Sequence, residues 1–94
     1  MSAKFVFPRA LKELRVHLSQ TDSASQGLRN FLVKQYPALK RDNPNTPILI
    51  REALGVRPTV FARFERGRES RIHLDSVAEK DIEGSIKKLI DGGN

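Results

Sequence analysis

The sequence contains no cysteine. Without a thiol the protein cannot form a disulfide, exchange disulfides or build a zinc–thiolate site. Its two histidines lie far apart in the sequence, which argues against a metal site. The longest apolar stretch, residues 47–50, is far shorter than the roughly 18 residues that a membrane-spanning helix needs. The sequence therefore predicts neither sulfur chemistry, nor a bound metal or other cofactor, nor a membrane-spanning helix.

Positive charge is what the sequence has in excess. Seventeen Lys and Arg against 11 Asp and Glu give a formal net charge of +6. Such a balance favours an acidic partner, which is a nucleic acid, an anionic membrane surface or an acidic protein face. The alternative is a basic protein without such a partner. The length of 94 residues predicts one domain with a modest core, and 38% hydrophobic residues are typical of a globular protein.

The apolar pattern predicts two helices and four strands. Apolar and polar residues alternate over residues 14–18, which indicates a strand, and apolar residues recur at helical spacing over 28–40. We predict further strands over residues 48–50, 59–64 and 71–74, and a second helix that begins after Ser76, the first residue of a capping box, and ends at Gly92-Gly93. The predicted order is β-α-β-β-β-α, with a helix on each face of the sheet or both helices on one.

Several details of this α/β domain follow from single residues. Pro58 suits the first position of a strand, and Gly67 suits the positive φ of a hairpin turn. Phe61 and Phe64 are expected on opposite faces, both in the core. The apolar run 48–50 indicates a strand covered on both faces, as in a parallel pair. Pro37 is expected to kink the first helix or to start its last turn.

The first ten residues form a basic arm ahead of the domain, which covers residues 11–94. Residues 1–9 hold Lys4 and Arg9 and no acid, as in a mitochondrial import segment, but they are short and include Pro8. An arm packed on the domain or on a partner is the alternative. His17 is expected to be half-buried under a helix rather than catalytic, because no nucleophile is near it in the sequence.

The hairpin region carries the strongest binding signal. Five arginines are expected to form a positive patch around its turn: Arg57, Arg63, Arg66, Arg68 and Arg71. Arginine binds carboxylate and phosphate in a bidentate manner, so the patch suits acidic protein or RNA. A solvated face partly neutralised by Glu65 and Glu69 is the alternative.

Three stretches carry a resemblance to a known family. They are Leu-Arg-Val-His-Leu-Ser-Gln at residues 14–20, Ser-Gln-Gly-Leu-Arg at 25–29 and Asn-Thr-Pro-Ile-Leu-Ile-Arg-Glu at 45–52. The chain resembles the small thioredoxin-like accessory subunit of mitochondrial NADH:ubiquinone oxidoreductase, respiratory complex I, whose domain also occurs in two mitochondrial ribosomal proteins. The resemblance implies a thioredoxin-like fold, a four-stranded mixed sheet with flanking helices. The Pro-Thr entry of the predicted hairpin also resembles the third strand of that fold, where the proline is usually cis.

The resemblance also implies a role without chemistry. Thioredoxin-like oxidoreductases carry Cys-x-x-Cys after the first strand, whereas this chain has Ser19, Gln20, Thr21, Asp22 and Ser23 there. Some family members have a cysteine where Ser19 and Ala53 stand, so any thiol switch is lost here. No Gly-x-Ser-x-Gly motif or phosphate-binding loop replaces it. We therefore expect no enzyme activity. The polar residues of this loop are expected to cap the following helix, through Asp22, Ser23 or Ser25.

The function implied is that of a non-catalytic subunit of the respiratory chain. Such a subunit docks on the matrix arm of complex I, next to the large iron–sulfur subunit, and supports assembly or stability. It is peripheral to the mitochondrial inner membrane, on its matrix side, and binds no DNA. The alternative is a mitochondrial ribosomal protein that binds rRNA through its basic surface. Co-purification with either assembly separates the two.

Overall fold

The computed structural model describes residues 5–92. Its elements are β1 (Leu11–Leu18), the short 3-10 turn η1 (Ser23–Ser25), α1 (Gln26–Asp42), β2 (Ile48–Glu52), β3 (Thr59–Phe64), the 3-10 turn η2 (Glu65–Gly67), β4 (Glu69–His73) and α2 (Glu79–Gly92). This confirms the predicted order of two helices and four strands. No helix within residues 5–92 combines the length and the apolar character that crossing a membrane requires.

The strands form one mixed sheet in the order β2-β1-β3-β4. β1 pairs in parallel with β2 and antiparallel with β3, and β3 pairs antiparallel with β4. A parallel pair needs a crossover connection, which α1 supplies, whereas the antiparallel pair β3–β4 needs only a tight turn. The α/β class and the mixed sheet are as predicted, and the architecture is compatible with a thioredoxin-like fold.

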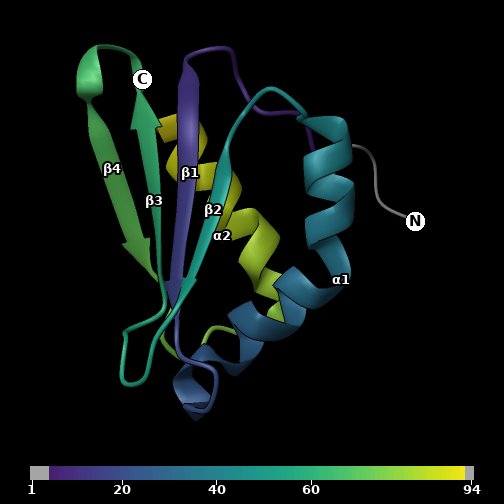
Figure 1. Ribbon diagram of the computed structural model, residues 1–94, viewed down its shortest axis with the longest axis vertical. Helices are drawn as coiled ribbons and strands as arrows, with labels where there is room; N and C mark the ends of the chain where they lie inside the picture. The colour runs from purple at the N-terminus through teal and green to yellow at the C-terminus, as the bar shows by residue number, and fades with distance from the viewer. Residues whose placement is uncertain (1–4, 93–94) are drawn as a thin grey trace.

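Both helices lie on the same side of the sheet (Figure 1). Leu14, Val16 and Leu18 of β1 are buried beneath the helices, together with Val60 and Phe64 of β3. Because successive side chains of a strand point to opposite faces, the residues between them project from the other face. Of the two arrangements expected, the structure has the one in which a whole face of the sheet lacks a covering helix.

The expectation that β2 is covered on both faces is wrong. Ile48 is buried, but Leu49 is 51% exposed and Ile50 is 40% exposed. β2 is an edge strand, so one of its sides has no neighbouring strand from the described part of the chain, and Leu49 projects from the uncovered face. A short apolar run has no period from which burial on one face could be distinguished from burial on two.

Phe61 and Phe64 do lie on opposite faces, but only Phe64 is in the core. Phe61 is half-buried on the uncovered face, where its ring centroid lies 4.8 Å from that of His17. His17 is therefore half-buried, as predicted, but against an aromatic ring and not under a helix. Both corrections have one cause, which is that no helix packs on this face.

The predicted capping box at Ser76 is wrong. α2 begins at Glu79, and Ser76 has a φ of 59° in the turn before it. A helix N-cap residue typically has extended φ and ψ, so Ser76 does not cap α2. Its N–H instead donates to the carbonyl of Ala24 at 2.9 Å, which ties this turn to the start of α1.

The hairpin connection is longer than a two-residue loop, because η2 and Arg68 separate β3 from β4. Gly67 has a φ of 74°, as predicted, and Arg66 also has a positive φ, of 65°. The N–H of Phe64 donates to the carbonyl of Arg68 at 2.7 Å and closes the turn. Pro58 is buried just ahead of β3, and no peptide bond within residues 5–92 is cis, so the cis proline of the resembled fold is absent here.

The described part of the N-terminal arm packs on the domain. Phe5 and Phe7 are buried and meet edge to face, with ring centroids 5.3 Å apart. Asn43, directly after α1, accepts a hydrogen bond from the Phe7 N–H at 2.8 Å and donates one to the Phe5 carbonyl at 2.7 Å. The remainder of the arm, residues 1–4, and Gly93 of the predicted helix end lie outside the described residues.

α1 is longer than predicted and contains Pro37. A proline inside a helix removes one backbone hydrogen bond and crowds the preceding turn, which bends the helix. α1 is visibly bent along its length (Figure 1). Asn43 follows the last helical residue, and its N–H donates to the carbonyl of Leu39 at 3.0 Å, so the helix ends directly ahead of Asn43-Pro44.

Candidate interaction surface

The loop after β1 contains no reactive group. The hydroxyl of Ser19 is buried and accepts hydrogen bonds from the N–H groups of Thr21 and Asp22, both at 3.3 Å. The hydroxyl of Ser25 accepts one from the Ser19 N–H at 3.1 Å. These contacts fold the loop tightly onto the start of α1. Neither Asp22 nor Ser25 makes a capping bond to the helix through its side chain, so the predicted capping is not formed.

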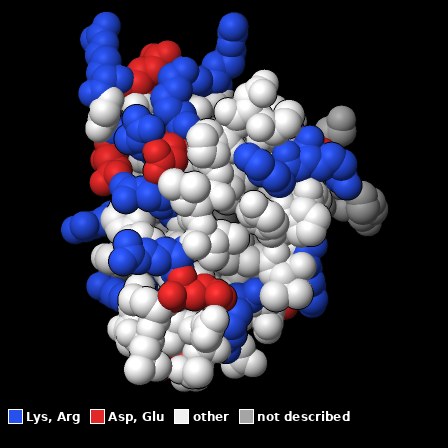
Figure 2. Space-filling view, viewed as in Figure 1, with Lys and Arg blue, Asp and Glu red and all other residues white. Residues whose placement is uncertain are grey.

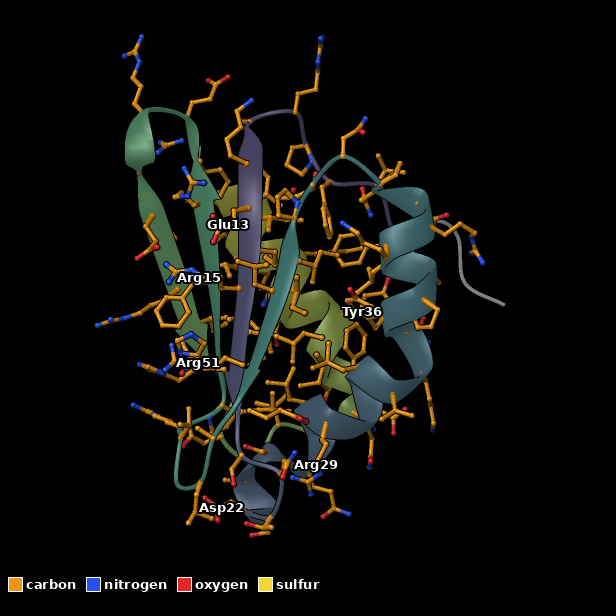
Figure 3. The ribbon with its side chains drawn as sticks, viewed as in Figure 1. Glu13, Arg15, Asp22, Arg29, Tyr36 and Arg51 are labelled. Atoms are coloured by element: carbon orange, nitrogen blue, oxygen red, sulfur yellow. The ribbon has the colours of Figure 1, made fainter. Side chains whose placement is uncertain are left out.

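Arg29 adds a second restraint to this loop. Its guanidinium donates to the carbonyls of Ser19 at 2.9 Å and of Asp22 at 3.3 Å, and Figure 3 shows Arg29 and Asp22 together at this end of the molecule. The loop residues Ser19, Gln20, Thr21, Asp22 and Ser23 therefore shape the connection. Nucleophilic catalysis requires a base within hydrogen-bond reach of the hydroxyl, and His17 is on the opposite face of the sheet.

Neither histidine belongs to a cluster that could hold a metal. Within residues 5–92 no three His, Asp or Glu side chains are grouped as metal ligands. Nδ1 of His73 lies 3.0 Å from the hydroxyl of Thr59. Burial, followed by the charges of Arg15 and Arg51, lowers the pKa of His17 below its usual 6.5. Above pH 6.5 the His17 ring is therefore mostly neutral and adds little charge to the uncovered face.

The five hairpin arginines do not form one patch. Arg66 and Arg68 lie at the turn, whereas Arg57 lies at the far end of the hairpin and pairs with Asp75 at 2.7 Å. Arg63 bonds Glu13 at 2.8 Å, and Arg71 projects from the uncovered face in the middle of β4. The hairpin is extended, so residues near in sequence are spread along its length.

The uncovered face of the sheet forms a continuous surface of paired residues. Leu49, Arg15, Phe61 and Arg71 stand side by side across the four strands, and Arg51, His17, Thr59 and His73 form the next row. The guanidinium of Arg15 lies over the Phe61 ring, 5.2 Å from its centroid. Arginine stacked on an aromatic ring leaves its edge free to bind a carboxylate.

Charge on this face is unevenly balanced. Glu13 bonds Arg63 and Arg15, and Arg15 also bonds Glu69. Within residues 5–92 no carboxylate pairs with Arg51 or Arg71. Figure 3 shows Glu13, Arg15 and Arg51 along the strands, and Figure 2 shows Lys and Arg mixed with Asp and Glu on this side of the molecule. The face thus has an unpaired cation near each edge of the sheet: Arg51 on β2, next to the exposed Leu49, and Arg71 on β4.

Sequence reasoning named Arg63 and Arg71 of this face and missed Arg15 and Arg51. Both lie on strands other than the hairpin and join it only through the register of the sheet. The available signal was the strict alternation of β1, which placed Arg15 and His17 on one face. Once both helices lie on the other face, that alternation alone assigns Arg15 and His17 to the exposed surface.

Comparisons with known proteins identify relatives of this chain. The model of the mitochondrial ribosomal protein L51 / S25 / CI-B8 domain matches residues 28–78. The chain is 46% identical over 90 residues to the NADH-ubiquinone oxidoreductase 10.5 kDa subunit of Neurospora crassa. These residues make up 96% of this chain and 96% of the relative.

Relatives from an animal and a plant are similar over nearly as much of the chain. The chain is 39% identical to NADH dehydrogenase (ubiquinone) 1 alpha subcomplex subunit 2 of Mus musculus, over 87% of this chain and 83% of the relative. It is 41% identical to the subunit of that name in Arabidopsis thaliana, over 90% and 88%. Because the domain model covers more than half of the chain and each relative is similar over most of its length, the protein belongs to the family of the mitochondrial ribosomal protein L51 / S25 / CI-B8 domain.

Proposed function

We propose that the protein is an accessory subunit of mitochondrial NADH:ubiquinone oxidoreductase. The observation that carries this proposal is similarity over nearly the whole chain to proteins named as subunits of that enzyme in a fungus, an animal and a plant. This similarity extends over 87–96% of the chain, so it concerns the domain as a whole and not a single motif.

The proposed role is structural and not catalytic. The loop after β1 has hydroxyls that are used in its own hydrogen bonds, as Ser19 is, and His17 has an aromatic ring and two arginines around it. A nucleophile or a general base needs a partner of complementary chemistry in a pocket. We therefore expect the protein to act through binding, supporting the assembly or stability of the enzyme.

The proposed position is the matrix arm, peripheral to the inner membrane. The large iron–sulfur subunit is the neighbour implied by the family resemblance. The unpaired Arg51 and Arg71 suit an acidic surface on that neighbour, and the turn residues Arg66 and Arg68 extend the basic surface at the end of the hairpin. The side chains of Phe5 and Phe7 are buried in the protein's own core, so Val6, which is 64% exposed, is the large apolar side chain that residues 5–10 offer to a partner.

Cofractionation tests the proposal. A tagged form of the full chain, expressed in the mitochondria of its host, is separated by sedimentation under conditions that resolve respiratory complexes from ribosomes. We expect the tag to migrate with NADH dehydrogenase activity. Migration with the ribosomal subunits, in fractions whose protein is released by ribonuclease, would instead support the rRNA-binding alternative that the family also contains.

Salt dependence distinguishes the two partners further. Binding to RNA weakens steeply with salt, because each phosphate contact releases a counterion. Docking on a protein through a few charged groups and apolar side chains responds less, since the apolar part is insensitive to salt. Retention in the enzyme at about 0.3 M salt, at which a phosphate-dependent complex with several contacts dissociates, is the expected result.

A further inference from the structure

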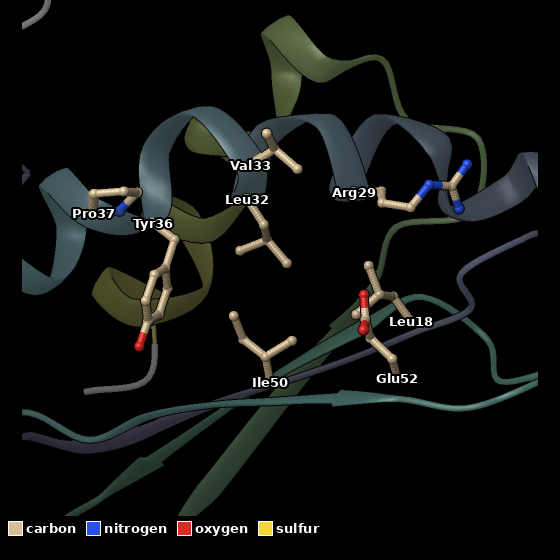
Figure 4. Close-up of a pocket in the computed structure, with 8 residues that line it drawn as sticks. All are labelled: Leu18, Arg29, Leu32, Val33, Tyr36, Pro37, Ile50 and Glu52. Carbon is tan, nitrogen blue, oxygen red and sulfur yellow. The ribbon is translucent and has the colours of Figure 1, made fainter.

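An apolar groove runs between the edge strand β2 and helix α1. It has a volume of about 310 Å³ and is lined by Leu18, Arg29, Leu32, Val33, Tyr36, Pro37, Ile50 and Glu52. Figure 4 shows Ile50 and Glu52 on the strand side, with Leu32, Val33 and Tyr36 facing them from α1. The only charged groups of this lining, Arg29 and Glu52, lie at one end. The groove is therefore apolar along most of its length.

Two of the lining residues expose an unusual amount of apolar surface. Val33 is 76% exposed and Ile50 is 40% exposed, although most of the large apolar side chains of residues 5–92 are buried. Figure 2 shows uncharged surface running down the middle of the molecule, between the charged strand side and the lysines and arginines on α1. Contiguous apolar surface rimmed by charge is typical of a site that binds another protein.

The strand beside this groove has a free edge. Leu14 donates to the carbonyl of Pro47 at 3.0 Å, and Ala53 donates to the carbonyl of Leu18 at 3.1 Å. In a parallel ladder alternate residues bond to the same neighbour, so Leu49 and Arg51 also bond β1. The N–H and C=O groups of Ile48, Ile50 and Glu52 consequently point away from the sheet, where no strand of residues 5–92 pairs with them.

The groove and the free edge fit the same kind of ligand. A strand added to β2 has side chains that alternate between the two faces of the sheet. On the helix side these side chains enter the groove next to Ile50. On the other side they lie beside Leu49 and the unpaired Arg51. Every second side chain of an added strand thus meets the apolar groove, and the side chains between them lie on the face that carries Arg51.

We propose that β2 and the groove bind an extended segment of a neighbouring subunit, which adds a fifth strand to the sheet. The segment alternates apolar residues, which fill the groove, with at least one Asp or Glu, which pairs with Arg51. A second copy of this chain is a poor occupant, because the net charge of +6 makes two copies repel each other. The proposal deepens the proposed function, since it names the kind of contact through which the subunit docks.

Site-directed cross-linking identifies the occupant. A photoreactive phenylalanine derivative replaces Val33, which is so exposed that the substitution leaves the core intact, and the assembled complex is purified after irradiation. We expect cross-links to one short stretch of one partner chain that alternates apolar and acidic residues. Cross-links to a second copy of this chain, to a stretch without a carboxylate or to no chain at all would overturn the proposal.

A pair of matched variants measures the contribution of the groove. Val33→Glu and Leu54→Glu both replace an exposed apolar residue by glutamate and change the charge equally, but Leu54, which is 87% exposed, does not line the groove. We expect Val33→Glu to reduce incorporation into the complex by roughly tenfold, because it places a carboxylate in an apolar contact. Leu54→Glu is expected to stay within about twofold of the parent. Equal effects would contradict the proposal.

A proline at position 50 tests the strand pairing itself. Ile50→Pro removes an N–H that points to the free edge, so the ladder between β1 and β2 keeps its bonds, and prolines are tolerated on edge strands. We expect loss of incorporation with a normal circular dichroism spectrum. A folded Ile50→Pro protein that assembles normally would exclude strand addition. The assembly in which the cross-linked partner occurs tests the proposed function separately, since a ribosomal partner would overturn only that.

Discussion

At the scale of single residues, Asn43 has a larger structural role than its polarity indicates. It is buried, and besides its two bonds to the N-terminal arm its side chain donates to the carbonyl of Leu39 at 3.0 Å. These bonds satisfy the Phe7 N–H and the Phe5 carbonyl, whereas the Leu39 carbonyl also accepts a hydrogen bond from the Asn43 N–H. Asparagine fits because its amide carries both an acceptor and two donors.

Asn43→Ala should therefore destabilise the protein. Leaving the Phe7 N–H and the Phe5 carbonyl without partners is expected to lower the free energy of unfolding by about 2 kcal/mol. Chemical denaturation of the isolated chain measures it. Asn30→Ala is the control, since Asn30 is exposed on the same helix and the change favours helix formation. Equal stability of the two variants would contradict the role of Asn43.

His17 gives the protein a specific pH dependence. Burial and the neighbouring Arg15 and Arg51 lower the pKa of His17 in the folded state below 6.5. As the pH falls, the unfolded chain therefore binds a proton at a higher pH than the folded protein does. The contribution of neutral His17 to the free energy of unfolding is complete above about pH 6.5 and is lost as the pH falls toward the lowered pKa. His17→Gln should lose less stability than the parent between about pH 7 and pH 5.

Nuclear magnetic resonance checks this directly. Titration of the His17 ring signals in the folded protein should give a pKa below 6.5. A midpoint at or above that value would show that the two arginines and the partial burial do not govern this side chain.

At the scale of elements, the start of α1 packs against the connection between β4 and α2. A Cβ atom added to Gly27 would lie 1.9 Å from the carbonyl oxygen of Val77, which is backbone and has little room to move. The neighbouring bond from the Ser76 N–H to Ala24 holds the same two segments together. Only glycine permits this approach.

The same substitution at two glycines should have opposite effects. Gly27→Ala is expected to destabilise the protein by about 3 kcal/mol, because the added methyl group overpacks a backbone contact. Gly84→Ala, in an exposed position of α2 with nothing within 4 Å, should stabilise it by roughly 0.5–1 kcal/mol through helix propensity. Thermal melting compares them, and a shift of the same sign in both variants would refute the packing argument.

The elements were largely predictable because their signals are local. Alternation in β1 and helical spacing in α1 each follow from residues a few positions apart, and Gly67 marked the hairpin turn. Ser76 misled because a capping box consists of two residue types at a fixed spacing, which a left-handed turn can also contain. The packing of Gly27 on Val77 joins residues 50 positions apart and has no local signal.

At the scale of the whole molecule, the uncovered face is the feature that the sequence left open. Both placements of the helices satisfied the apolar stripes, so neither the exposure of Phe61 nor the row through Arg15 and Arg71 could be predicted. The hairpin arginines were identified as a group, but their spread along the strands depends on register. Long-range pairing decides which charges meet, as with Glu13 and Arg63.

Reversing charge on the uncovered face should weaken docking. Arg51 and Arg71 pair with no carboxylate within residues 5–92, so the double variant Arg51→Glu/Arg71→Glu removes no ion pair of the fold. We expect at least a tenfold loss of incorporation into the complex with an unchanged melting temperature, because like charges then face an acidic partner. Native gel electrophoresis with quantification of the tagged chain measures it.

A charge-matched control is available on the helix layer. Lys80→Glu/Lys88→Glu alters the net charge equally at two exposed positions of α2, which lies on the other face of the sheet. We expect normal incorporation. Equal loss in both double variants would mean that total charge, and not this face, governs docking. Arg63 is a less informative target, because Arg63→Glu would break its ion pair and place a second glutamate next to Glu13.

The free edge of β2 has a consequence for the protein before it is assembled. An unpaired strand flanked by exposed apolar side chains is a template for aggregation, and β2 has only its short length and the charges of Arg51 and Glu52 against this. A surplus copy in the organelle thus carries its own liability, countered mainly by mutual repulsion among its cations. Synthesis of this subunit must accordingly keep pace with that of its neighbours, and proteolysis should clear any excess.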